Sequence, residues 1–146
     1  MVEGAGRADL RDLTVVIPVR CESERRRRNL ALVIRYLLRW FYVRIAIAEE
    51  GTRDVPELVR GLDVLYLPYD GGGELFHHTR LRNLLVRAAR TRLVAIYDVD
   101  ALLPPAQMIE AVRMLRHGGY HGVHPYDGRC FDVPEHLHEA IARELR

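Results

Sequence analysis

The sequence contains no lysine, so all 22 residues of the Lys and Arg type are arginines. Guanidinium groups that bind phosphate can account for a few of these positions but not for 22, and a biased genome composition explains the pattern most simply. With 20 acidic residues the formal net charge is only +2, and the charges are well mixed along the chain. The composition therefore gives no reason to expect a nucleic-acid partner.

Cysteines and long apolar runs are scarce as well. The two cysteines, Cys21 and Cys130, form neither a metal-ligand pattern nor a disulfide framework, so we expect reduced thiols. No apolar run approaches the roughly twenty residues of a membrane span, and residues 1–12 are too polar for a secretory signal. We therefore expect a cytoplasmic protein without a transmembrane segment.

The length of 146 residues and the hydrophobic fraction of 49% fit one globular domain. We expect a flexible leader at 1–12 and a single domain at 13–146. Apolar periodicity predicts strands at 13–19, 43–48, 63–67, 92–97 and 120–126, and helices at 27–40, 56–60, 76–90, 105–117 and from 133–135 to 146. This alternation of strands and helices predicts an α/β fold with a mainly parallel central sheet and helices on its faces.

The stretch 92–105 is the most informative part of the chain. Apolar residues lead into Asp98-Val99-Asp100, and Pro104-Pro105 prevents the strand from continuing. We expect a buried, central strand whose alternating side chains put Asp98 and Asp100 on the same side. Converging carboxylates suit Mg²⁺ or Mn²⁺. The alternative interpretation is that both acids only end the strand and cap the following helix.

Two loops are open to interpretation. The run Arg25–Arg28 follows the first strand, at the edge where ligands bind in open α/β sheets. It is either a solvated edge or a contact for phosphate or an acidic partner. The loop containing Gly71, Gly72 and Gly73 lacks the spacing of a phosphate-binding P-loop, and we expect it to form a mobile lid.

Several segments resemble the nucleotide-sugar-binding half of family-2 glycosyltransferases with the GT-A fold. These are the strands at 15–19 and 45–48, the segment 49–54, Asn83 and the Asp-Val-Asp motif. Residues 76–83, Phe-His-His-Thr-Arg-Leu-Arg-Asn, and 98–104 are closest to matching segments of β-1,4-galactosyltransferases and chondroitin-type polymerases. The resemblance implies a Rossmann-like, three-layer GT-A fold.

It also implies a nucleotide site. By resemblance, Pro18, Val19 and Arg20 would line the nucleotide, and Glu50 would lie near the base in place of an aspartate. His78 stands where the galactosyltransferases have an arginine. The positive charge toward the diphosphate would then have to come from two neighbouring arginines, Arg80 and Arg82, and His78 is either a nucleotide contact or simply an exposed side chain.

The same resemblance implies a metal site. Asp98 would face the ribose and the metal, and Asp100 would ligate a Mn²⁺ or Mg²⁺ ion that bridges the diphosphate. A metal at that point stabilises the charge that develops on the departing diphosphate. His124 is a further candidate ligand.

The resemblance does not extend to the general base of such a transferase. The family's Trp-Gly-x-Glu-Asp type segment does not occur in this sequence. Asp127 is the best candidate for a carboxylate that deprotonates an acceptor hydroxyl, although an aspartate before glycine also simply forms a turn.

Three functions therefore stay open. The first is a metal-dependent glycosyltransferase that moves a sugar from a nucleotide-sugar donor, expected to be a UDP-sugar, to a hydroxyl of a glycan or small molecule. Its acceptor contacts would come from loops or from a second subunit of a homo-oligomer. The second is a non-catalytic module that binds a nucleotide sugar or a partner. The third is a nucleotidyltransferase, which ranks last because the loop 21–24 has no glycine.

Overall fold

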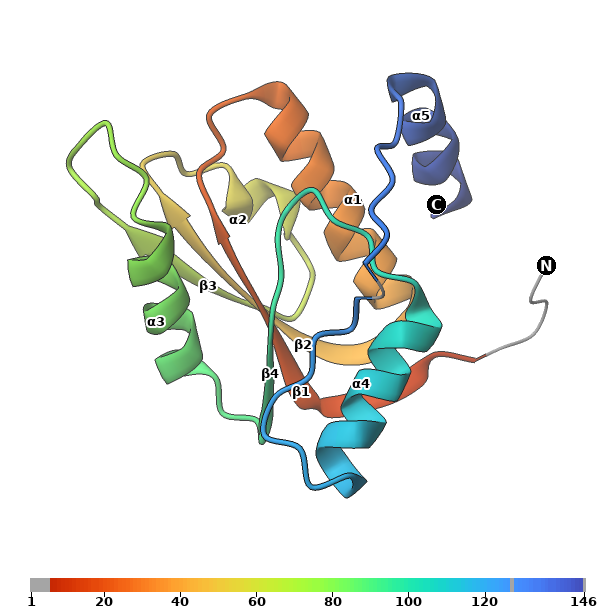
Figure 1. Ribbon diagram of the computed structural model, residues 1–146. Coiled ribbons are helices and arrows are strands. Elements are labelled where there is room, and N and C mark those ends of the chain that lie inside the picture. Colours follow the sequence, from red (N-terminus) through yellow and green to blue (C-terminus); the bar gives the residue numbers. More distant parts are fainter. Residues whose placement is uncertain (1–5, 127, 146) are drawn as a thin grey trace.

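The protein has a Rossmann-like α/β fold with four parallel strands in the order β3-β2-β1-β4 (Figure 1). The computed structural model describes residues 6–126 and 128–145. The strands are β1 Ala8–Val19, β2 Phe41–Glu50, β3 Val64–Tyr69 and β4 Leu93–Ile96. The helices are α1 Glu24–Trp40, α2 Val55–Leu58, α3 His78–Ala88, α4 Pro105–His117 and α5 Glu135–Glu144. The predicted fold class is confirmed.

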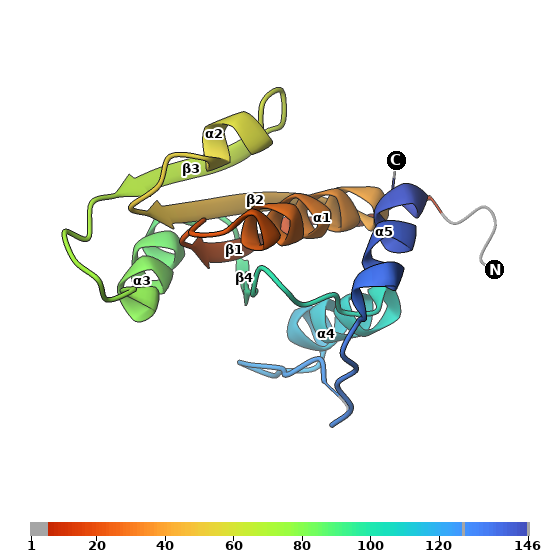
Figure 2. The same cartoon turned by 90° about the horizontal axis from the view of Figure 1, so that it is seen from above.

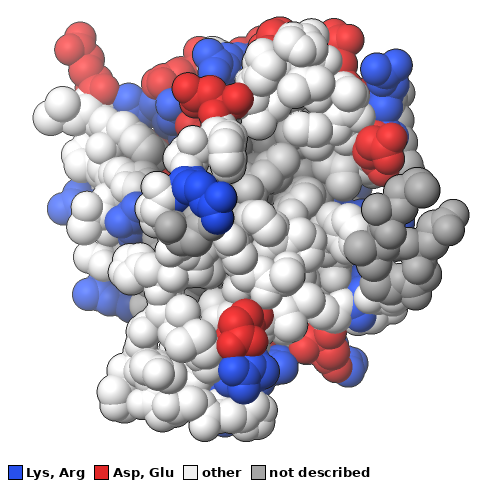
Figure 3. Space-filling model, turned by 45° about the vertical axis from the view of Figure 1, so that its right-hand side comes forward, with Lys and Arg blue, Asp and Glu red and all other residues white. Residues whose placement is uncertain are grey.

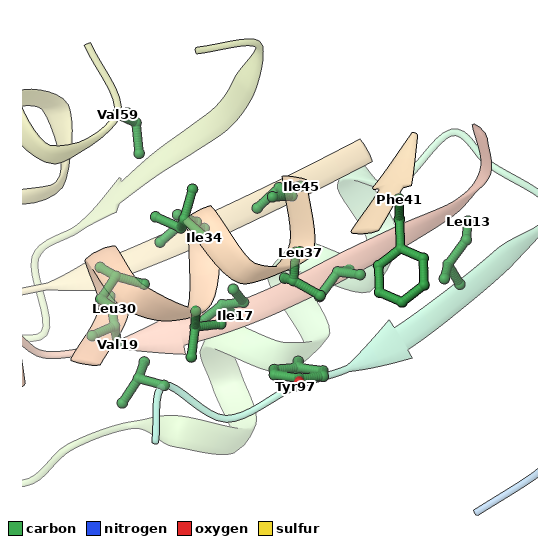
Figure 4. Packing of buried hydrophobic residues seen from close by; sticks show 14 of the residues in the cluster. Leu13, Ile17, Val19, Leu30, Ile34, Leu37, Phe41, Ile45, Val59 and Tyr97 are labelled. Carbon is green, nitrogen blue, oxygen red and sulfur yellow. The ribbon is translucent and has the colours of Figure 1, made fainter. Parts of the chain in front are cut away.

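The helix α1 begins earlier than its apolar pattern predicts, because Ser23 caps it. The Ser23 Oγ accepts a hydrogen bond from the Arg26 N–H at 3.2 Å, and Glu24 places a negative charge at the positive end of the helix dipole. Leu30, Ile34 and Leu37 belong to its buried face, which packs on the sheet over β1 and β2 (Figure 4). The first turn of α1 therefore directly follows the carboxyl end of β1.

Helices cover the two faces of the sheet, which gives three layers (Figure 1). Val15, Ile17 and Val19 of β1 belong to the larger core, together with residues of α1, α2 and α4. Val16 points the other way and packs in the smaller core with Leu81 and Leu85 of α3. Alternation of side chains along β1 thus separates the two cores.

The helix α5 packs loosely on this body. None of its described residues is buried. It lies beside α1 (Figure 2), to which it is joined by an Arg28–Glu135 ion pair of 3.0 Å and by a 3.0 Å hydrogen bond between His138 Nε2 and Asn29 Oδ1. Its contribution to the fold is peripheral.

Two predicted segments are corrected by the structure. Residues 8–12 are part of β1 rather than of a leader, because Ala8 pairs with Phe41 and Arg116 of α4 donates a 2.9 Å hydrogen bond to Asp12. Residues 120–126 form no strand. Without that strand, β4 is an edge strand among the described residues rather than a central one, and Ile96 is 54% exposed.

Two prolines lie inside strands. Pro68 lies inside β3, which tolerates it because β3 is an edge strand. Pro18 lies inside β1 opposite Ala48. The Val16 carbonyl accepts from the Tyr97 N–H on the β4 side, so the backbone of Pro18, two residues later, faces the same side beyond the end of β4. Its missing N–H therefore costs no ladder hydrogen bond.

The surface agrees with the mixed charge of the sequence. On the face shown in Figure 3, acidic and arginine side chains are interspersed around a largely uncharged middle. Among the described residues, no helix has the length and apolar character needed to cross a membrane.

Candidate functional site

A cavity of about 280 Å³ lies at the carboxyl ends of β1 and β4. It is lined by Pro18, Arg26, Phe76, His78, Asp98, Val99 and Asp100. The strand order reverses between β1 and β4, because β2 and β3 lie on one side of β1 and β4 lies on the other. Such a switch point at the carboxyl edge is where open α/β sheets bind ligands.

The two predicted acids both line this cavity. Asp98 and Asp100 are exposed, whereas Tyr97 and Val99 are buried, each with 7% of its surface exposed. This alternation puts both carboxylates on the cavity side. Among the described residues Asp100 has no hydrogen-bond or ion-pair partner, and Asp98 has only two long ion-pair contacts. Both carboxylates are therefore available to a ligand.

Asp98 and Asp100 do not cap the next helix, which was the alternative interpretation. The N-cap residue of α4 is Pro104, and no side chain accepts a capping hydrogen bond there. Two tyrosines hold the turn instead. The Tyr97 hydroxyl accepts from the Leu103 N–H at 3.0 Å, and the Tyr36 hydroxyl donates to the Leu103 carbonyl at 2.7 Å. Burial raises the pKa of both tyrosines, so both remain neutral in this role.

Two arginines and a histidine approach the acids from two helices. Arg26, in the first turn of α1, lines the cavity. From α3, His78 Nε2 lies 3.8 Å and Arg82 Nη2 lies 4.0 Å from Asp98 Oδ1. The cavity thus combines two carboxylates with the Arg26 guanidinium, and the Arg82 guanidinium lies beside Asp98. This mixture suits a cation bound together with a phosphate group.

Three residues at the carboxyl end of β1, Pro18, Val19 and Arg20, were predicted to line a nucleotide. Of these, only Pro18 lines the cavity. The Val19 side chain is fully buried in the core beside Leu30 (Figure 4). Arg20 contacts the glycine-rich loop instead. Its guanidinium donates to the carbonyls of Glu74 at 2.8 Å and Leu75 at 2.9 Å, and it lies 5.6 Å from the centre of the Phe76 ring.

Glu50 is engaged inside the protein. Its carboxylate is 1% exposed and accepts a hydrogen bond from the His77 N–H at 2.7 Å, while His77 Nδ1 lies 2.6 Å and Arg20 Nη2 lies 3.5 Å away. Burial alone would raise the pKa of Glu50, but the hydrogen bonds and charges of His77 and Arg20 outweigh burial and lower it. A base contact by Glu50 would have to compete with these partners.

The Arg20–Glu50–His77 cluster holds the loop that we expected to be a mobile lid. Arg20 binds the carbonyls of residues 73–75, and Glu50 anchors His77. The two residues that flank His77, Phe76 and His78, both line the cavity. The cluster therefore positions one wall of the cavity.

Gly71 lies against this cluster, and its lack of a side chain is required there. A Cβ added at Gly71 would overlap the Glu50 Oε1, whereas a Cβ at Gly73 would meet nothing within 4 Å. We expect Gly71→Ala to lower the free energy of unfolding by about 1–3 kcal/mol through overpacking, as measured by urea denaturation. Gly73→Ala is the matched control and should change it by less than about 0.5 kcal/mol. Equal effects of the two changes would contradict this packing.

A second cluster of ligand-type side chains lies nearby, formed by Cys21, Glu49 and Asp54. It is the one group in the described part of the chain with three such atoms within 4.8 Å of one another. However, the fully buried Glu49 carboxylate already accepts four hydrogen bonds, from Thr52 Oγ1, Asp54 N, Val55 N and Tyr66 Oη. These use its acceptor capacity, so the cluster serves to anchor the start of α2.

The environment of Cys21 makes its thiol unreactive. Burial, together with the negative charges of Glu49 and Asp54, raises the pKa of Cys21 to about 12. Cys130 is exposed. We expect a disulfide reagent such as DTNB to titrate one thiol in the native protein and both in denaturant, with Cys130→Ser abolishing the native reaction. Rapid native labelling of the Cys130→Ser protein would contradict this environment.

Two further predicted site residues, Arg80 and His124, do not line the cavity. Arg80 is exposed and donates to the Tyr69 hydroxyl at 2.7 Å. His124 is exposed and is not among the lining residues, so the structure does not bring it to the acids. Asp127, the candidate general base, lies outside the described residues.

Comparison with known proteins does not assign a family. No family model matches this sequence, and no curated protein matches it. The fold class therefore rests on the observed order of the strands, and the proposed chemistry rests on the residues that line the cavity.

Three lining residues were missed or left undecided from the sequence, namely Arg26, Phe76 and Val99, which lies between the two acids. Arg26 belongs to the arginine run for which a solvated edge and a ligand contact both stayed open, and the structure places one of its four members at the cavity. Phe76 marked the resemblance but received no role. Its position beside a glycine-rich loop was the available signal, since such loops bring their ends to the carboxyl edge of a sheet.

Proposed function

We propose that this chain binds a nucleotide sugar with a divalent metal ion and acts as a glycosyltransferase of the GT-A, family-2 type. The observation that carries the proposal is the pair Asp98 and Asp100, which line one cavity at the switch point of the sheet without hydrogen-bond partners among the described residues. The place of the acids after β4 is compatible with the Asp-Val-Asp motif on which the resemblance partly rests.

The side chains divide into groups that suit the parts of such a donor. Asp98 and Asp100 would hold Mn²⁺ or Mg²⁺, which prefer oxygen ligands and leave positions for phosphate oxygens and water. When bound, the ion supplies positive charge to the departing diphosphate. Arg26 offers a guanidinium fork to the same diphosphate. Phe76 brings an aromatic ring to the cavity wall, where a base can pack against it beside Arg20 and His78.

Thermal unfolding in the presence of UDP, GDP or ADP, with and without Mn²⁺, tests binding. At a ligand concentration of 100 Kd the complex gains about 2.7 kcal/mol, which raises the Tm by roughly 5–10 °C. We expect this rise for one nucleotide with Mn²⁺ and its loss in Asp100→Asn. A Tm that is unchanged by all three nucleotides would contradict the proposal.

A non-catalytic nucleotide-binding module is the second candidate, and one observation favours it. The acids among the lining residues are Asp98 and Asp100, so no further described carboxylate of the cavity is left to act as a general base. Release of UDP from UDP-sugars, measured with a panel of hydroxyl acceptors, separates the two. Manganese-dependent binding without release of UDP would support the module.

A further inference from the structure

His78 and Asp98 approach each other across the cavity from different elements. His78 is the first residue of α3, and Asp98 follows β4. The imidazole Nε2 lies 3.8 Å from the Asp98 Oδ1, and both side chains line the cavity. His124, the histidine expected from the sequence to approach the acids, does not line it.

The direction of the His78 ring is set by its neighbours. Its backbone follows His77, which Glu50 anchors through the N–H bond of 2.7 Å. Its ring packs on the Phe76 ring, with 5.5 Å between the ring centres. The Nε2 is thus presented toward Asp98 by a held segment, as a metal ligand must be.

The separation of the two atoms fits a shared ion. Imidazole nitrogens and carboxylate oxygens bind a divalent transition metal at about 2.0–2.2 Å, so two of them on one ion lie at most about 4.4 Å apart. The 3.8 Å between His78 Nε2 and Asp98 Oδ1 is within that limit. Asp100 lines the same cavity but would have to turn its side chain to join them, because the three ligand atoms do not lie within 4.8 Å of one another.

We propose that His78 is a metal ligand together with Asp98, so that the cavity selects a transition metal over Mg²⁺ and Ca²⁺. This rests on the proposed metal-dependent function and narrows the choice of metal. Mg²⁺ and Ca²⁺ favour oxygen ligands, whereas an imidazole nitrogen raises affinity along the series from Mn²⁺ to Co²⁺. The site therefore prefers Co²⁺ to Mn²⁺ and Mn²⁺ to Mg²⁺.

The nearby guanidinium groups determine how the test is designed. Arg82 lies 4.0 Å from the Asp98 Oδ1 and Arg26 lines the cavity, so both oppose a bare cation and favour a metal that carries phosphate. Metal binding is therefore measured with inorganic pyrophosphate present. Titration with Co²⁺, followed by its visible absorption, and competition by Mg²⁺ give the affinity of each metal without any turnover.

We expect His78→Asn to weaken Co²⁺ binding at least tenfold, to alter the cobalt spectrum and to leave the Mg²⁺ affinity within twofold. His124→Asn, the matched control, should change neither metal. Asp98→Asn should weaken both. An unchanged Co²⁺ affinity and spectrum in His78→Asn, with Asp98→Asn still impaired, would overturn the role of His78 and leave the proposed function standing. Absence of metal binding by the native protein would overturn both.

Discussion

Glu50→Gln will destabilise the protein by roughly 2–4 kcal/mol, which is a large part of a typical domain's stability. The change leaves Arg20 without its buried anion and turns one acceptor of Glu50 into an N–H₂ donor that faces His77. This loss of stability is toward the lower end of the range expected when one partner of a buried ion pair is removed. The reason is that the His77 side chain is 34% exposed and can recover some hydration. Urea denaturation measures it.

The control for Glu50→Gln is an ion pair at the surface. Asp70 pairs with Arg53 and its side chain is 89% exposed. Asp70→Asn should therefore cost less than about 1 kcal/mol. If Glu50→Gln cost no more than this control, the Arg20–Glu50–His77 cluster would not hold the loop.

Stability should also fall on the acid side because of Glu50. Its pKa is lowered from the ordinary value of 4.5 in the folded protein, so its contribution is fully present above pH 4.5 and is lost as the pH falls through the lowered pKa. We expect the free energy of unfolding to decrease below pH 4.5 more steeply in the native protein than in Glu50→Gln. Denaturant unfolding at a series of pH values measures this, and parallel curves for the two proteins would contradict it.

Asp98→Asn combined with Asp100→Asn will abolish binding of a manganese–nucleotide complex while leaving the fold intact. Both side chains are exposed and make no hydrogen bonds among the described residues, so stability should change by less than about 0.5 kcal/mol. Loss of both ligands should weaken the affinity at least about 100-fold, since even the partners of metal ligands are worth 10–100-fold. Equilibrium binding of UDP with Mn²⁺ measures this.

The Asp70→Asn protein is again the matched control, because it removes an exposed acid that does not line the cavity. It should bind as the native protein does. Equal affinities for the native protein and for the doubly substituted protein would show that the acids are not ligands.

Local patterns in the sequence were sufficient to predict features that depend only on the geometry of a single strand or helix. Alternation along a strand placed Asp98 and Asp100 on one side, and apolar periodicity located all five helices to within a few residues. Their common position at the cavity could be predicted because residues two apart in an extended segment project to the same side. The parallel sheet followed from the alternation of strands and helices.

Contacts between distant segments could not be predicted in the same way. Nothing local distinguishes Arg20, which binds a loop more than fifty residues away in the sequence, from Arg26, which lines the cavity. Glu50 was predicted near a base, but its nearest partners are decided by where Gly71 and His77 fold over it. Residues 120–126 were predicted to form a strand but do not. For this reason β4 lies at the edge of the sheet among the described residues.

The most direct test of the proposed nucleotide site is calorimetric titration of the native protein with UDP and with GDP, first in EDTA and then in Mn²⁺. We expect one nucleotide to bind in Mn²⁺ and its heat to disappear in EDTA, because we propose that the diphosphate is held through a metal on Asp98 and Asp100. Absence of binding by either nucleotide in Mn²⁺ would contradict it. The acids at the end of β4 would then be features of the turn alone.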